Sequence, residues 1–158
     1  MPDGVLDELD RKILAHYQRD TRISVGKLGA EVGLSAAAVH RRLKRLRDDG
    51  VIEAEIAVIA PAAVGLPLTC IVEIDLDREG TSELDGFAER MRGCPAVQQC
   101  FYVTGQFDFI AIVVVADMAA YDAFTRAYLL ADANVKSFTT HVAFSRIKTG
   151  LALAIQAG

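Results

Sequence analysis

Apolar residues near the start of the chain recur at the three- and four-residue spacing of an amphipathic helix. The stretch LDELDRKILAHYQRD places five such side chains on one helical face: Leu6, Leu9, Ile13, Leu14 and Tyr17. The residues between them are mostly charged or polar, as expected for a face that meets water. This pattern predicts a helix that packs one side against neighbouring elements.

Two shorter helical patterns follow, separated by a glycine. The first, VGKLGAEV, comes after Ser24, which we expect to cap it, and ends at Gly33, where a positive φ stops a helix. Ser35 predicts the cap of a third helix, over about residues 36–49. The apolar stripe of that helix consists of Val39, Leu43 and Leu46. Two short helices joined by a tight, glycine-containing turn predict a helix-turn-helix.

A strand-like run and a hinge come next. Residues 51–60, VIEAEIAVIA, predict a strand that follows the helix-turn-helix. Residues 61–67, PAAVGLP, contain two prolines and one glycine, which is typical of a linker. We therefore predict a helix-turn-helix domain over residues 1–60, a hinge over 61–67 and a second domain over 68–158.

Strand and helix patterns alternate in the second domain. Strands are predicted at 68–77 and 135–148, helices at 82–93 and 118–130, and GLALAIQ is a candidate for a further strand. Between the two helices, AVQQCFYVTG and FDFIAIVVVA predict a hairpin that turns around Gly105 and Gln106. The order β-α-β-β-α-β is that of a ferredoxin-like domain, so the fold class is α+β.

An antiparallel sheet with both helices on one face leaves its other face uncovered. Several residues predicted on that face are apolar, and a second sheet of the same kind would cover them. We therefore expect a homodimer that forms through this domain.

Charge is distributed unevenly along the chain. The whole protein has a formal net charge of −4, yet five of its seventeen Lys and Arg residues lie between Arg41 and Arg47. A turn of about 100° per residue places Arg41, Lys44 and Arg45 opposite the apolar stripe of the third helix, and places His40, Arg42 and Arg47 on its flanks. The alternative is a charged face that meets only solvent. We favour a DNA-facing helix because residues 36–47 contain no acidic partner.

Several functional classes are disfavoured by the sequence. No apolar run reaches the roughly 18 to 20 residues of a membrane span, and the acidic start, MPDGVLDELDRK, lacks the apolar core of a signal peptide. Cys70, Cys94 and Cys100 form no CxxC pair. They favour reduced, buried thiols in a cytoplasmic protein without a redox or metal role. We therefore expect no metal, no cofactor and no membrane partner.

Three stretches together resemble the Lrp/AsnC family of bacterial and archaeal regulators. They are LDELDRKILAHYQRDTRIS, LGAEVGLSAAAVHRRLKRLRDDGVI and VTGQFDFIAIVVVADMAAYDAF. The resemblance implies a winged or plain helix-turn-helix and a ferredoxin-like domain that binds a small effector, commonly an amino acid. It also implies double-stranded DNA as a partner, dimers that assemble into octamers, and a nucleoid-associated location.

Family resemblance and helix geometry together predict the DNA-binding residues. We expect Ala37, His40 and Arg41 near base edges, where side chains read sequence. The other candidates contact phosphate or lie at helix starts: Ser24, Ser35, Arg42, Lys44, Arg45 and Arg47. The family often has proline at the position of Ala36, so this helix start is less rigid here.

By the same resemblance, the effector lies near the hairpin turn, between subunits. The implied residues are Thr104, Gly105, Gln106, Phe107 and Asp108, with Thr139 and Thr140 nearby. Asp108 would accept the ammonium of an amino acid, and backbone and hydroxyl donors would hold its carboxylate. The alternative is a plain hairpin turn in which Asp108 caps a neighbour. Asn134 stands where the family commonly has glycine, which alters a neighbouring loop.

Three other functions remain open from sequence alone. An architectural DNA-binding protein would share the basic helix and lack the effector. A tetrapyrrole decarboxylase, an enzyme of related architecture, would need more cationic and acid-base groups than the second domain offers, where His141 is the only histidine. A thiol or metal sensor would use Cys94, Cys100 and a histidine, at a spacing that fits no standard site. We therefore expect a regulator without enzymatic activity.

Overall fold

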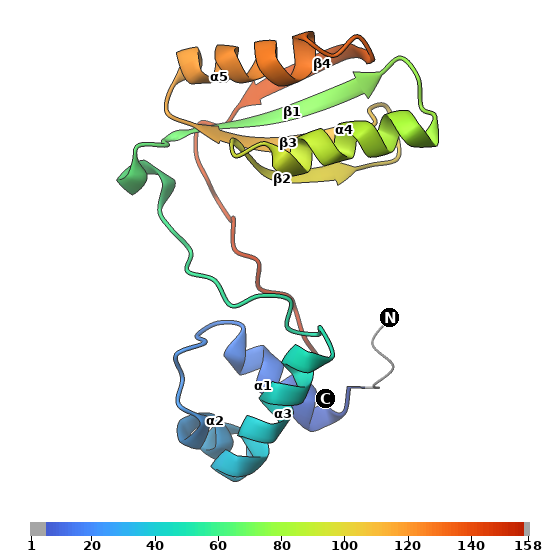
Figure 1. The fold of residues 1–158 in the computed structure, drawn as a ribbon. Coiled ribbons are helices and arrows are strands. Elements are labelled where there is room, and N and C mark those ends of the chain that lie inside the picture. The colour runs from blue at the N-terminus through green and yellow to red at the C-terminus, as the bar shows by residue number, and fades with distance from the viewer. Residues whose placement is uncertain (1–5, 157–158) are drawn as a thin grey trace. The chain divides into compact units, whose positions relative to one another are not determined.

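The computed structural model describes residues 6–156, which form two compact units (Figure 1). The first unit contains the described residues up to Ala57 together with those from Lys148 onward, and the second is Val58–Ile147. The chain therefore passes between the units twice. The C-terminal segment, which the predicted boundary of 68–158 assigns to the second domain, packs with the first unit instead.

The first unit contains three helices, α1 (Glu8–Tyr17), α2 (Val25–Val32) and α3 (Ala36–Asp48). The N-caps are Asp7, Ser24 and Ser35, each of which accepts a hydrogen bond from a backbone N–H of the first turn. Gly33 ends α2 with a φ of 73°. The predicted helix-turn-helix is thus confirmed, with its two predicted caps, Ser24 and Ser35, and its glycine.

A small apolar core holds the three helices together. Its buried side chains come from the predicted faces: Ile13, Leu14, Tyr17, Leu28, Val32, Val39, Leu43 and Leu46. The turn between α2 and α3 is tight because the backbone N–H of Leu34 donates to the carbonyl of Gly29 at 2.9 Å. This packing fixes the side of α3 that faces away from the core.

The strand predicted at 51–60 is wrong. Residues 53–60 form neither helix nor strand, and Val58 is 88% exposed. The described residues of the first unit offer no strand to pair with this run, so its β-branched residues alone do not make one. The helix-turn-helix described here is therefore the plain form, without a strand wing.

The second unit confirms the ferredoxin-like order. It consists of β1 (Leu68–Leu76), α4 (Thr81–Gly93), β2 (Val97–Tyr102), β3 (Phe109–Val115), α5 (Met118–Thr125) and β4 (Val135–Val142). A 3₁₀ turn, η1 (Pro61–Val64), precedes β1, and a π-helical turn, η2 (Arg126–Leu130), extends α5. All neighbouring strands are antiparallel, in the order β2-β3-β1-β4.

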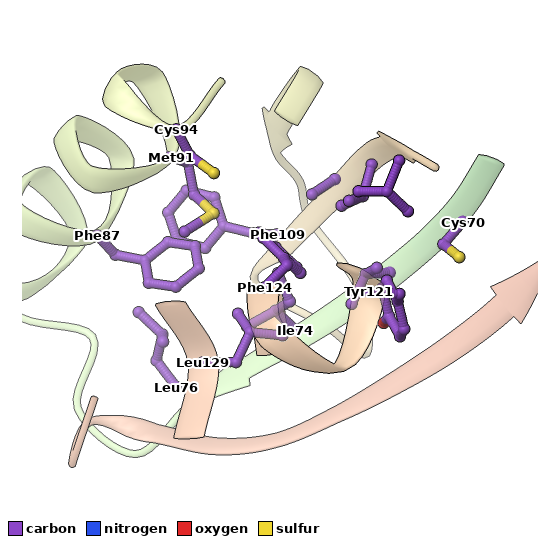
Figure 2. Packing of buried hydrophobic residues seen from close by; sticks show 14 residues of the cluster. Cys70, Ile74, Leu76, Phe87, Met91, Cys94, Phe109, Tyr121, Phe124 and Leu129 are labelled. Carbon is purple, nitrogen blue, oxygen red and sulfur yellow. The ribbon is translucent and has the colours of Figure 1, made fainter. Parts of the chain in front are cut away.

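Alternation along the strands decides which side chains are buried. On β1 and β3, every second residue faces the helices, and Figure 2 shows Ile74 and Phe109 packed with Phe87 and Met91 of α4. The aromatic rings of Phe87 and Phe109 lie 4.7 Å apart, centre to centre. Both helices cover this one face, as predicted, so the opposite face of the sheet is uncovered in the single chain.

The further strand predicted at GLALAIQ is also wrong, and β4 ends earlier than the predicted residue 148. The C-terminal segment (residues 148–156) instead packs on the first unit, where Ile155 joins the apolar core. The Gln18 side chain donates to the Leu153 carbonyl at 2.9 Å and accepts from its N–H at 2.8 Å. The side-chain amide of Gln18 thus satisfies the backbone N–H and carbonyl of Leu153, as a neighbouring strand would.

Candidate functional site

The outer face of α3 carries the predicted DNA-binding residues. Val39, Leu43 and Leu46 are buried, and the side chains between them point away from the core. The predicted residues that are exposed on this helix and at its cap are Ser35, Ala37, His40, Arg41, Lys44, Arg45 and Arg47. Arg42 is the exception, since its side chain is only 20% exposed. The structure therefore brings most of the predicted residues onto one accessible surface.

Two arginines of this face are bound to a buried carboxylate of α1. Asp10 has a side chain only 1% exposed, and its Oδ1 accepts from Arg42 Nη1 at 2.7 Å. Its other oxygen, Oδ2, forms an ion pair with Arg45. Arg42 Nη1 also donates to Asp7 Oδ2 at 2.7 Å. These pairs give the buried carboxylate of Asp10 the hydrogen-bond partners that burial would otherwise deny it.

Asp7 takes part in the same network through the capping box of α1. Its Oδ1 accepts from the backbone N–H of Asp10 at 2.7 Å, and Asp10 Oδ2 accepts from the N–H of Asp7 at 3.2 Å. The hydrogen bond from the Asp10 N–H, followed by that from Arg42, lowers the pKa of Asp7. Hydrogen bonds to Asp7 and Asp10 raise the pKa of Arg42 above its ordinary value. The start of α1 is thus bound to the middle of α3.

A second network binds the end of α3. Arg47 Nη2 donates to Glu55 Oε1 at 2.8 Å and to the Tyr17 hydroxyl at 2.9 Å, and that hydroxyl donates to Glu55 Oε1 at 2.5 Å. The hydrogen bonds from Arg47 and Tyr17 lower the pKa of Glu55. Burial and the bond to Glu55 raise the pKa of Tyr17. Arg47 is therefore partly engaged within the unit.

Two cations meet solvent more freely. Lys44 pairs with Asp48 one helical turn on, with both side chains more than half exposed. Arg41 and His40 make no ion pair with any described residue. The exposed ion pair between Lys44 and Asp48 is weak, so Arg41 and Lys44 are the cations most accessible to a ligand.

Ser24 and Ser35 serve first as caps. Their hydroxyl oxygens accept from the backbone N–H groups of Lys27 and Ala38, each at 3.2 Å. Each hydroxyl hydrogen stays available to a phosphate oxygen, because a serine hydroxyl both donates and accepts.

Sequence reasoning missed the acidic partners of the basic helix. The absence of acidic residues within 36–47 excluded neither Asp48, which pairs with Lys44 one turn further along α3, nor Asp7, Asp10 and Glu55, which lie elsewhere in the chain. Asp10 did carry a signal: it stands three and four residues before Ile13 and Leu14, on the apolar face of α1. An acidic residue at a core position predicts a buried cationic partner.

The predicted effector loop joins β2 to β3. Thr104, Gly105 and Gln106 are exposed, and Gly105 has a φ of 128°. Phe107 and Asp108 are half-buried. Asp108 Oδ2 accepts from the backbone N–H of Leu76 at 2.7 Å. One carboxylate oxygen of Asp108 thus already binds β1, beside the irregularity at Asp75 and Leu76.

The two threonines predicted near this loop lie on opposite faces of the sheet. Thr140 pairs with Val72 and lies on the helix side, where its hydroxyl is 2.5 Å from that of Tyr121. Thr139 pairs with Glu73 and is exposed on the uncovered face. Adjacent residues of a strand point to opposite sides, so the two hydroxyls do not line one wall within a single chain.

The cysteines are separated and largely buried. Cys70 and Cys94 are buried and Cys100 is half-buried, and no disulfide joins them. Burial raises the pKa of Cys70 and Cys100, which favours the unreactive thiol form. Among the described residues, no cluster of histidine, cysteine and carboxylate side chains has the arrangement of a metal site. No helix in that same part of the chain is long and apolar enough to cross a membrane.

Comparison with known proteins covers both units. Residues 6–47 match the AsnC-type helix-turn-helix domain, and residues 69–153 match the Lrp/AsnC ligand binding domain. The HTH-type transcriptional regulator y4tD of Sinorhizobium fredii is 41% identical over 96% of this chain and 89% of its own length.

Two solved structures share the fold over nearly the whole chain. An AsnC family transcriptional regulator from Agrobacterium tumefaciens superposes with a TM-score of 0.87 and 33% identity, covering 94% of this chain and 96% of its own. The transcriptional regulator NMB0573 of Neisseria meningitidis, in complex with L-Met, gives 0.86 and 30% with the same coverage. By sequence and by fold, the chain belongs to the Lrp/AsnC family of transcriptional regulators.

Proposed function

We propose that the protein recognises specific double-stranded DNA sites through α3 and regulates transcription there without enzymatic activity. The observation that carries this proposal is the exposed cationic face of α3, the second helix of a helix-turn-helix. In such motifs, the second helix enters the major groove. The relatives named as transcriptional regulators support this assignment.

Within this proposal, the exposed residues of α3 have different tasks. Ala37, His40 and Arg41 lie toward base edges, and Arg41 is the best candidate for guanine because arginine reads its O6 and N7 together. Lys44, Arg45 and Arg47 neutralise phosphates, and Ser24 and Ser35 donate hydroxyl hydrogen bonds. Arg42 is mainly a structural residue, since Asp7 and Asp10 hold it.

The test compares Arg41→Ala with Lys44→Ala on a DNA site selected by the wild-type protein. Arg41→Ala should relax sequence preference at one base position and reduce specific binding by about tenfold to a hundredfold. Lys44→Ala should weaken binding to all sequences and lower the salt slope by about one. If both variants bind the selected site like wild type, α3 does not read DNA.

We further propose that an amino acid modulates DNA binding or assembly from the loop at Thr104–Asp108. The match to a ligand binding domain and the L-Met complex of a structural neighbour support this part. Gly105 permits close backbone approach, and the second oxygen of Asp108 would accept the ammonium group. Thermal unfolding against the twenty amino acids, with light scattering for mass, tests it, because a ligand of the native state raises the melting temperature.

A second candidate function is an architectural DNA-binding protein that takes no effector. Two observations favour it: Asp108 already accepts from Leu76, and Thr139 and Thr140 face opposite ways. In that case no amino acid shifts the melting temperature of the wild-type protein. Asp108→Asn then changes only the stability of the protein, through the weakened bond to Leu76.

We also propose that the uncovered sheet face joins two copies into a dimer, from which larger assemblies form. The face carries Ile71, Phe101, Ile110, Ile112 and Val114 near its centre, with Ile71 37% and Phe101 52% exposed. A second copy would remove this apolar surface from water.

A further inference from the structure

A hollow on the outer side of α3 is lined by Arg41, Arg42 and Arg45. It has a volume of about 320 Å³. Three guanidinium groups around one hollow repel each other, and an anion that lies among them or behind them offsets this repulsion. In this structure the anion behind them is the carboxylate of Asp10, which bonds Arg42 and Arg45 at the same time.

The paired arginines retain donors for a ligand. A guanidinium has five N–H donors, and among the described residues Arg45 is bonded only through Nη2, to Asp10. Arg42 makes both of its bonds through Nη1. The Arg45 side chain is 48% exposed, so it reaches solvent beside Arg41 while its end is held in place. The guanidinium groups of Arg42 and Arg45 can therefore bind an external anion through two or more N–H donors. Little side-chain entropy is lost on binding, because Asp10 already holds both groups.

We infer that this hollow binds one backbone phosphate of DNA and that Asp10 is the positioning residue that holds Arg45, and behind it Arg42, in place for that phosphate. The inference rests on the proposed function, in which α3 lies against DNA. It adds a residue of α1 that touches no DNA, and it assigns the phosphate to Arg45, with Arg42 behind it, so that Arg41 at the rim of the hollow remains the candidate for a base edge.

If Asp10 acted only through its negative charge, it would weaken DNA binding, whereas a positioning role strengthens it. A carboxylate near DNA repels phosphates, so replacing Asp10 by a neutral residue should strengthen binding if charge alone matters. If Asp10 positions the arginines, its loss weakens binding despite the added positive charge. The sign of the change therefore separates the two explanations.

The experiment titrates full-length wild type, Asp10→Asn and Asp48→Asn with the DNA site selected by wild type, over a series of salt concentrations. Asp48→Asn is the matched control, because it removes the same charge from an exposed partner of Lys44. We expect Asp10→Asn to bind about tenfold or more weakly with a salt slope lower by about one, since each phosphate contact contributes about 0.9 to that slope. Asp48→Asn should bind as tightly as wild type or more tightly.

A double-mutant cycle with Arg45→Ala distinguishes positioning from a general structural role. The effect of Asp10→Asn on the salt slope should vanish in the Arg45→Ala background, whereas independent effects would add. Should Asp10→Asn fail to fold, as judged by circular dichroism, Arg45→Ala still tests the hollow. It should lower the salt slope by about one phosphate contact, whereas Arg41→Ala should mainly relax sequence preference.

Two outcomes overturn the inference. One is a folded Asp10→Asn that binds as tightly as wild type with the same salt slope. The other is a folded Arg45→Ala variant that binds DNA with the wild-type salt slope. If wild type binds no DNA at any salt concentration, the proposed function fails, which is a different result from either of these.

Discussion

Gly29 lies where α2 meets the start of α3, and it has no room for a side chain. A Cβ added there would overlap the backbone carbonyl oxygen of Leu34. That oxygen belongs to the turn of the helix-turn-helix, which cannot shift without moving the start of α3. Gly26, three residues earlier on the same helix, has open space around it.

Gly29→Ala should therefore destabilise the first unit by about 1–3 kcal/mol, the usual cost of overpacking. Gly26→Ala is the control, and it should raise stability by up to about 1 kcal/mol, because alanine favours a helix more than glycine does. Chemical unfolding followed by circular dichroism measures both. A Gly29→Ala variant as stable as wild type would show that the turn is looser than described.

The Glu55 network makes the stability of the first unit depend on pH. The pKa of Glu55 is lowered from its ordinary value of 4.5 by hydrogen bonds from Arg47 and Tyr17. A lowered pKa in the folded state means that this contribution is complete above pH 4.5 and is lost as the pH falls through the folded value.

We expect Glu55→Gln to flatten the acid limb of the stability curve below about pH 4.5. Glu53→Gln should leave that limb unchanged, because Glu53 is exposed and makes no ion pair with the described residues. Thermal unfolding at a series of pH values measures the difference. Identical acid limbs for wild type and Glu55→Gln would contradict the role of this network.

The spacing of apolar residues was sufficient to locate the helices of the first unit and the strands of the sheet. It predicted α1, α2 and α3 with two of their caps, and the four strands of the sheet in order. It failed at 51–60 and at GLALAIQ, since both runs contain good strand formers for which the described chain provides no partner strand. Strand formation depends on a partner distant in sequence, and a local pattern contains no such information.

The residues of the candidate DNA-binding site on α3 could be predicted, but their partners elsewhere in the chain could not. Helical geometry predicted the outward cations of α3, because it needs only the residues of that helix. It could not predict that Asp10, more than thirty residues away, pairs with Arg42 and Arg45, because that contact arises from the packing of α1 on α3. For the same reason, the bond from Leu76 to Asp108 was visible only in the fold.

The C-terminal segment behaves as an added element of the first unit. Ile155 joins its apolar core, whereas Leu151 in the same segment is 66% exposed. Ile155→Ala should lower the stability of this unit by about 1–2 kcal/mol, less than for a fully buried isoleucine. Leu151→Ala is the matched control and should change stability by less than about 0.5 kcal/mol. Equal effects of the two variants would mean that Ile155 does not dock.

The assembly of the whole protein depends on the uncovered face of the sheet. Ile112 lies at its centre on β3, paired with Ile71 of β1 and Gln99 of β2. Light scattering should give wild type a mass of at least two chains, and Ile112→Lys a mass of one, because a lysine there would be buried without a partner. Met118→Lys is the control, since Met118 is 55% exposed at the start of α5, away from this face. If Ile112→Lys keeps the wild-type mass, the dimer forms elsewhere.

The docking of the C-terminal segment also affects how the protein is made. In most multidomain chains the N-terminal domain folds first, while the ribosome is still translating the rest. Here Ile155 and the backbone of Leu153 join the first unit only after the second unit, which precedes them in the sequence, has been synthesised. The DNA-binding unit therefore reaches its full stability only after the second unit has been synthesised, so a chain whose translation stops early carries a helix-turn-helix with an incomplete core.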